Sequence, residues 1–67
     1  MEKKIFIEGM SCEHCVKRVK AALKAIKNVK EVNVAVGIAT INFKKDISDE
    51  VLTTVIEDLG YQVIKIE

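Results

Sequence analysis

The chain has 67 residues, of which 49% are hydrophobic and 31% charged, and its formal net charge is +1. A chain this short buries roughly 60% of its unfolded surface, so we expect a single domain over residues 1–67. The near-neutral charge gives no general attraction to nucleic acid or to an anionic membrane, and no apolar run reaches the roughly 18 residues of a membrane span.

The N-terminal residues predict a cytoplasmic protein. Met1 to Lys4 lead directly into a strand pattern and contain no apolar segment of a signal peptide. Thiols stay reduced in the cytoplasm. A disulfide between Cys12 and Cys15 would close a very small loop and stabilise the fold little. We therefore do not expect the two cysteines to form a structural disulfide.

Alternating apolar and polar residues predict four strands. Their expected ranges are residues 3–8, 31–36, 38–43 and 61–66. In the first strand, Ile5 and Ile7 are expected to face the core and Phe6 to be half-exposed on the other face. Gly37 separates two β-branched runs, which predicts a hairpin. Val63 is the expected core residue of the last strand.

Apolar residues at helical spacing predict two amphipathic helices. The first is expected from about Cys12 to Lys27, with Ser11 as its N-cap. The second is expected to follow Ser48 as N-cap and to end at Gly60. The residues expected on the apolar faces are Val16, Val19, Ala22, Leu23 and Ile26 in the first helix, and Val51, Val55, Ile56 and Leu59 in the second. Ile47 and Leu52 stand at the two positions of a hydrophobic staple.

The element order is β-α-β-β-α-β. Right-handed crossovers place both helices on one face of a four-stranded antiparallel sheet, which is an α+β sandwich. The strand directions then bring three connections to one end: the loop before the first helix, the turn at Gly37, and the junction at Gly60 and Tyr61. We therefore expect Tyr61 to lie near the two cysteines.

Both cysteines and the only histidine fall in the segment from Gly9 to Cys15, where a strand gives way to a helix. The N-terminus of a helix presents unpaired N–H groups and a partial positive charge, which favour thiolate over thiol. Thiolates bind soft ions such as Cu(I) and Zn(II). Two thiolates at a loop tip would leave a bound ion open to an incoming ligand, and this favours metal transfer.

Three other interpretations of the cysteines remain open at this point. A closed structural zinc site needs four protein ligands, and only Cys12, His14 and Cys15 are typical ligands for it here. A Cys-x-x-Cys pair next to a histidine also fits a redox site of the thioredoxin type. Both cysteines could instead be small buried apolar residues, although a loop is an unusual place for two packing cysteines.

The segment Gly9-Met10-Ser11-Cys12-Glu13-His14-Cys15 resembles the Gly-Met-x-Cys-x-x-Cys signature of heavy-metal-associated domains. The resemblance continues through the hairpin from Val32 to Phe43 and the segment from Ile56 to Tyr61. It implies a ferredoxin-like fold, with Cys12 and Cys15 as the metal ligands and Met10 packed inward beneath the loop.

Within that family, His14 and Tyr61 resemble residues of bacterial copper chaperones of the CopZ type. This resemblance implies a cytoplasmic copper chaperone, not an enzyme, that carries Cu(I), with the other soft ions Zn, Cd, Hg and Ag as the alternatives. Its implied partner is a copper-transporting P-type ATPase or a copper-responsive repressor, with no nucleic acid and no membrane. We expect a monomer without metal, and the site is compatible with a metal-bridged dimer.

Two alternative functions follow from the same residues. One is a metal-binding N-terminal domain of a copper- or zinc-transporting P-type ATPase, and the other is a small thiol–disulfide oxidoreductase. The roles of two neighbours of the cysteines also stay open. His14 is either an auxiliary ligand that also tunes the thiolates or a solvated residue. Tyr61 either shields the ion or only packs against the loop.

Overall fold

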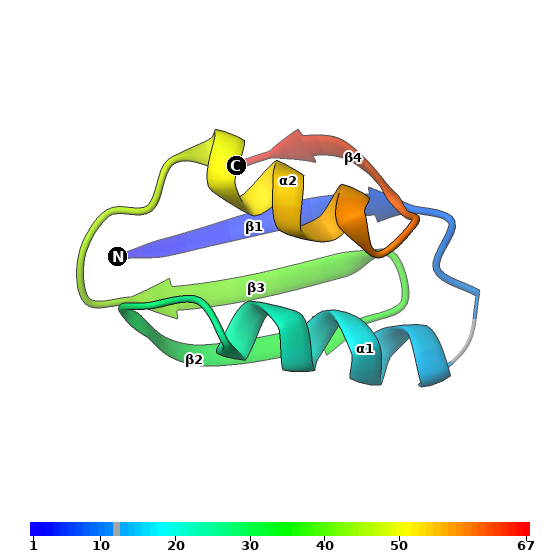
Figure 1. The fold of residues 1–67 in the computed structure, drawn as a ribbon, viewed down its shortest axis with the longest axis horizontal. Helices are drawn as coiled ribbons and strands as arrows, with labels where there is room; N and C mark the ends of the chain where they lie inside the picture. The colour runs from blue at the N-terminus through cyan, green and yellow to red at the C-terminus, as the bar shows by residue number, and fades with distance from the viewer. Residues whose placement is uncertain (12) are drawn as a thin grey trace.

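A four-stranded antiparallel sheet carries two helices on one face (Figure 1). The computed structural model describes residues 1–11 and 13–67. The elements are β1 (Glu2–Glu8), α1 (Glu13–Lys24), β2 (Val29–Ala35), β3 (Ile38–Phe43), α2 (Asp49–Asp58) and β4 (Gln62–Ile66). The strand order is β2-β3-β1-β4, so β1 and β3 are the central strands. This confirms the α+β, ferredoxin-like sandwich.

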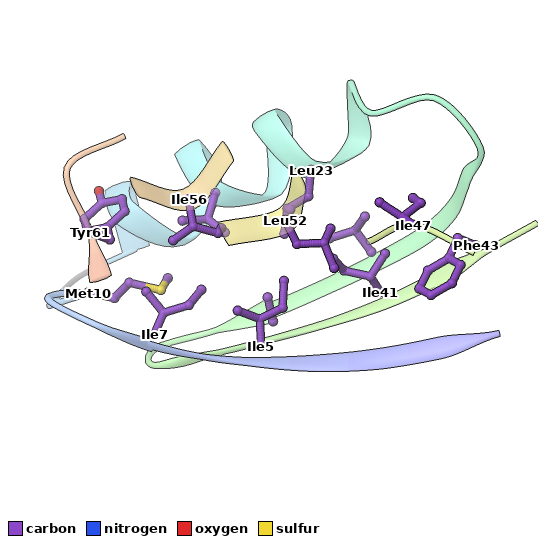
Figure 2. Packing of buried hydrophobic residues seen from close by; sticks show 13 residues of the cluster. Ile5, Ile7, Met10, Leu23, Ile41, Phe43, Ile47, Leu52, Ile56 and Tyr61 are labelled. Atoms are coloured by element: carbon purple, nitrogen blue, oxygen red, sulfur yellow. The ribbon is translucent and has the colours of Figure 1, made fainter. Parts of the chain in front are cut away.

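The hydrophobic core lies between the sheet and the two helices, as Figure 2 shows. Its buried members are Ile5, Ile7, Met10, Val19, Leu23, Val32, Ala39, Ile41, Phe43, Ile47, Leu52, Ile56 and Tyr61. In the strands these residues recur at every second position, which confirms the inward orientation of Ile5 and Ile7. Phe6 is half-buried on the opposite face, where the Lys65 ammonium lies 4.8 Å from its ring centroid. Val63 packs against the core and is only partly buried.

Helix α1 ends three residues before its predicted end at Lys27. The Ile26 N–H already bonds to the Leu23 carbonyl, a tighter contact than the α-helical pattern. Asn28 then adopts a left-handed backbone conformation with φ of 74°, which asparagine tolerates better than most residues. This turn lets β2 begin at Val29, two residues earlier than predicted. The predicted helix start at Cys12 lies outside the described residues.

The start of α2 agrees with its sequence signals. The Ser48 hydroxyl accepts a hydrogen bond from the Val51 N–H at 3.3 Å, as an N-cap does. Ile47 and Leu52 are both buried, which confirms the hydrophobic staple. Gly60 follows the helix with φ of 97°, and its N–H bonds to the Glu57 carbonyl.

The predicted apolar face of α2 is wrong at one position. Val51 is 44% exposed, whereas Leu52 is fully buried. The buried stripe therefore runs through Leu52 and Ile56, which are one turn apart, with Val55 and Leu59 half-buried beside it. Relative to Leu52, Ile56 lies about 40° to one side of the helix and Val55 about 60° to the other, whereas Val51 lies about 100° away, beyond Val55 and at the edge of the stripe. In the described part of the chain, neither helix is long and apolar enough to cross a membrane.

Lys3 joins β1 to the start of α2 at the end of the sheet where the chain begins. Its ammonium donates to the Ile47 carbonyl at 2.9 Å and to Asp49 Oδ1 at 2.7 Å, and Asp46 Oδ1 lies 3.7 Å away. The C-terminus lies at the same end, because Glu67 and Lys4 exchange two backbone hydrogen bonds. Figure 1 shows both termini away from the loop between β1 and α1.

The corrected face of α2 can be tested with two neighbouring substitutions. Leu52→Ala should lower the free energy of unfolding by about 3 kcal/mol, because it leaves a cavity in the core. Val51→Ala removes a largely exposed side chain and should change that free energy by less than about 1 kcal/mol. Urea denaturation followed by circular dichroism measures both. Equal losses in the two variants would contradict the observed helix orientation.

The Lys3 contacts predict a pH dependence of stability. The hydrogen bond to Asp49 raises the pKa of Lys3 above its ordinary value of 10.5, aided by the charges of Asp49 and Asp46 and opposed by partial burial. The folded state favours the charged ammonium of Lys3. The contribution of its contacts to the free energy of unfolding is therefore full at pH values below the ordinary pKa, and it is lost as the pH rises through the higher pKa of the folded state.

Lys3→Met should therefore lower the free energy of unfolding at neutral pH by about 1 kcal/mol, and the difference from the wild type should shrink at alkaline pH. Urea denaturation at neutral pH and above the ordinary lysine pKa measures the difference. Lys4→Met is the matched control, since Lys4 is exposed on the next residue of β1. A deficit for Lys3→Met that stays constant across this range would contradict the assignment.

Candidate metal-binding site

The connection between β1 and α1 lies at the same end of the molecule as the β2–β3 turn and the α2–β4 turn (Figure 1). The Ile7 N–H bonds to the Gly37 carbonyl at 2.9 Å, which joins β1 to the β2–β3 turn. A Cβ atom placed on Gly9 would lie 3.7 Å from Cδ1 of Tyr61. The predicted meeting of the loop, Gly37 and Tyr61 at one end is therefore confirmed.

Gly9 and Met10 set the course of the loop. Gly9 has φ of 97°, a conformation that side-chain-bearing residues rarely adopt, and it turns the chain out of β1. Met10 then points back into the core, where it is buried beside Ile7 and Tyr61 (Figure 2). This confirms the inward orientation of Met10. The loop is thus anchored from below by an apolar side chain of adaptable shape.

The structure places one of the two predicted ligands. Cys15 lies in the first turn of α1, is partly buried and packs against the core. Cys12 lies outside the described residues, so its predicted position beside Cys15 stays a prediction. Within residues 1–11 and 13–67, no three side chains of the metal-ligating types His, Cys, Asp and Glu are grouped as a metal site.

The outer side of the loop faces solvent. Ser11, Glu13 and His14 are all exposed. Glu13 is the first residue of α1, where a carboxylate favourably meets the positive end of the helix dipole. An exposed His14 is compatible with either of its two predicted roles, an auxiliary ligand or a solvated residue.

Tyr61 lies on the side of the loop that faces the core, which we call its inner flank, and is only 8% exposed. Its hydroxyl lies 3.5 Å from the donor Nη1 of Arg18, and the Arg18 guanidinium carbon is 5.8 Å from its ring centroid. Nη2 of Arg18 also donates to the Leu59 carbonyl at 3.3 Å. Arg18 therefore links α1 to the segment between α2 and β4.

Sequence reasoning missed this contact of Arg18. One signal was present in the sequence. Arg18 follows Cys15 by three positions, so the two residues share one side of the helix. The predicted topology also placed Tyr61 at the end of the domain where the cysteines lie.

The chemical character of the loop follows from its surroundings. The first-turn position of Cys15 gives its thiol group the electrostatic environment of a helix N-terminus, which favours negative charge. Met10 and Tyr61 close the inner side with apolar groups, and the exposed residues leave the outer side accessible. Such a loop is suited to a thiolate that exchanges a soft ion with an external ligand.

Comparison with known proteins gives consistent matches. Residues 4–62 match the heavy-metal-associated domain family. The chain is 42% identical over 67 residues to a probable copper-exporting P-type ATPase of Archaeoglobus fulgidus, and the match spans 96% of this chain but 8% of that protein. It is 37% identical to the copper chaperone CopZ of Bacillus subtilis, over 96% of this chain and 97% of CopZ. A solved CopZ metallochaperone superposes with a TM-score of 0.88 at 30% identity, covering 96% of this chain and all (100%) of the other.

Proposed function

Because this chain belongs to the heavy-metal-associated domain family, we propose that it is a cytoplasmic copper chaperone that binds Cu(I) through Cys12 and Cys15 and passes it to a partner. The observation that carries this proposal is the likeness to copper chaperones. The chain is 37% identical to CopZ of Bacillus subtilis, and a solved CopZ metallochaperone superposes with a TM-score of 0.88. In this proposal residues 1–67 form one heavy-metal-associated domain. The domain acts as a carrier of Cu(I) and not as an enzyme.

The residues of the loop suit Cu(I) as cargo. Thiolates are soft ligands, and Cu(I) is a soft ion. The N-terminus of α1 favours the negative charge that a thiolate at Cys15 carries. Zn, Cd, Hg and Ag ions share part of this preference and are the expected competitors. Met10 would act beneath the loop as a packing residue, because its side chain is buried in the core.

Transfer would proceed by ligand exchange on the ion, without a redox step. A partner thiolate attacks the bound Cu(I) and forms a three-coordinate intermediate. One cysteine thiolate of this chain then leaves and takes a proton from solvent. A second partner thiolate binds the ion and displaces the remaining cysteine thiolate, which is protonated in the same way. The partner would approach from the side of Ser11, Glu13 and His14, since these residues are exposed and the inner side is closed by Met10 and Tyr61.

The proposed partner is a copper-transporting P-type ATPase or a copper-responsive repressor. Lys17, Arg18, Lys20 and Lys24 are exposed on α1 and would favour a partner with an acidic surface. An auxiliary role of His14 would be compatible with a metal-bridged dimer of two copies. Size-exclusion chromatography with and without one equivalent of Cu(I) distinguishes a monomer from such a dimer.

The ligand assignment predicts the effect of single substitutions. Cys12→Ser and Cys15→Ser should each weaken Cu(I) binding by several orders of magnitude, because one hard hydroxyl replaces a soft thiolate. Competition against a chromophoric Cu(I) chelator measures the affinity, and circular dichroism should show an unchanged fold. Ser11→Ala is the matched control in the same loop, and His14→Ala tests an auxiliary ligand. Retention of wild-type affinity in either cysteine variant would refute the assignment.

A second function is favoured by the match to the archaeal ATPase, which at 42% has higher identity than the match to CopZ. The chain would then be the metal-binding domain of a copper- or zinc-transporting ATPase. The reading frame around the coding sequence separates these two functions, and the same competition experiment with Zn(II) separates the two ions. The alternative from another class is a thiol–disulfide oxidoreductase. In that case the metal-free protein should reduce the disulfides of insulin with multiple turnovers.

A further inference from the structure

We infer that Arg18 is a positioning residue that holds Tyr61 against the metal-binding loop and thereby slows ligand exchange at the bound ion. This inference rests on the proposed function of the loop as a Cu(I) site. It assigns a role to a side chain of α1 that is exposed, lies outside the Gly9–Cys15 segment and is not itself a ligand.

The contacts of Arg18 converge on the short connection that carries Tyr61. One arm of the guanidinium, Nη2, donates to the Leu59 carbonyl at 3.3 Å, and the other arm, Nη1, lies 3.5 Å from the Tyr61 hydroxyl. The guanidinium carbon is also 5.8 Å from the ring centroid, within the range of a cation–π interaction. A planar group with several donors can make these contacts together, which a lysine ammonium cannot do.

Tyr61 stands between the end of α2 and β4, directly after Gly60, which has a positive φ of 97°. Its ring lies against Gly9 and is buried next to Met10 (Figure 2). Arg18 reaches this ring from the other helix, so it restrains the ring with respect to α1, the helix that also carries Cys15.

The consequence concerns the route by which a competing ligand reaches the ion. Exchange requires an incoming thiolate or chelator to approach while the original ligands are still bound. With Tyr61 held in place, the inner flank is closed and only the solvent side is open. If the guanidinium is removed, the ring gains freedom, the inner flank opens part of the time, and exchange becomes faster.

Two measurements on the full chain test this role. Tyr61 is the only tyrosine and the chain has no tryptophan, so its fluorescence reports this ring alone. In metal-free protein, Arg18→Gln should increase quenching of this fluorescence by acrylamide. In the Cu(I)-loaded protein, it should raise the rate of Cu(I) transfer to an uncharged chromophoric chelator in stopped-flow mixing, roughly three- to fivefold, the scale of one partly exposed cation–π contact.

Two further variants make the test specific. Lys27→Gln makes the same change of charge at an exposed residue shortly after α1 and should leave both quantities at wild-type values. In a Tyr61→Leu background, Arg18→Gln should have no further effect on the transfer rate, because the residue through which it acts is gone. Circular dichroism confirms that each variant is folded.

The inference is overturned if Arg18→Gln matches Lys27→Gln in either measurement, or if its effect on transfer persists in the Tyr61→Leu background. Failure of the proposed function is distinguishable from these outcomes. If the wild type takes up no Cu(I), the proposed function is wrong, and the quenching comparison still decides whether Arg18 holds Tyr61.

Discussion

The burial of one face of β1 is the constraint on which the rest of the structure depends. β1 is hydrogen-bonded to β3 on one side and to β4 on the other, so neighbouring strands fix its position on both sides. Ile5 and Ile7 face the helices, and Met10 continues the same apolar contact after the chain has left the strand. The loop that follows is therefore attached to one of the two central strands of the sheet. A binding loop needs such a rigid base if its ligands are to keep their geometry.

Sequence reasoning succeeded where one local pattern determined the outcome. The alternation in β1 and β3 and the Ser48 cap with the staple of Ile47 and Leu52 agree with the structure. These features depend on neighbours within a few residues, and the physics of such contacts is encoded in spacing. The location of Tyr61 needed only the order of the elements and the handedness of their connections.

The errors arose where tertiary contacts decided between similar residues. The helical period alone could not tell whether Val51 or Leu52 faces the sheet, since both are apolar and adjacent. The end of α1 depended on where Asn28 turns the chain toward β2, and apolar spacing as far as Ile26 obscured that turn. The Arg18 contact joins residues 43 positions apart. The spacing of apolar residues along the chain does not predict a contact between two side chains so far apart in sequence. The metal-ligand role of Cys12 and Cys15 rests on the sequence signature and awaits the binding experiment.

The placement of the two chain ends has a consequence for how this unit can be used. Met1 lies beside Phe43, and Glu67 pairs with Lys4. Both chain ends therefore lie away from the loop between β1 and α1, as Figure 1 shows. A polypeptide fused to either end would extend away from the loop and leave it accessible. The position of the two ends therefore leaves the loop between β1 and α1 accessible to a second molecule, whether further segments are joined at one end, at both ends or at neither.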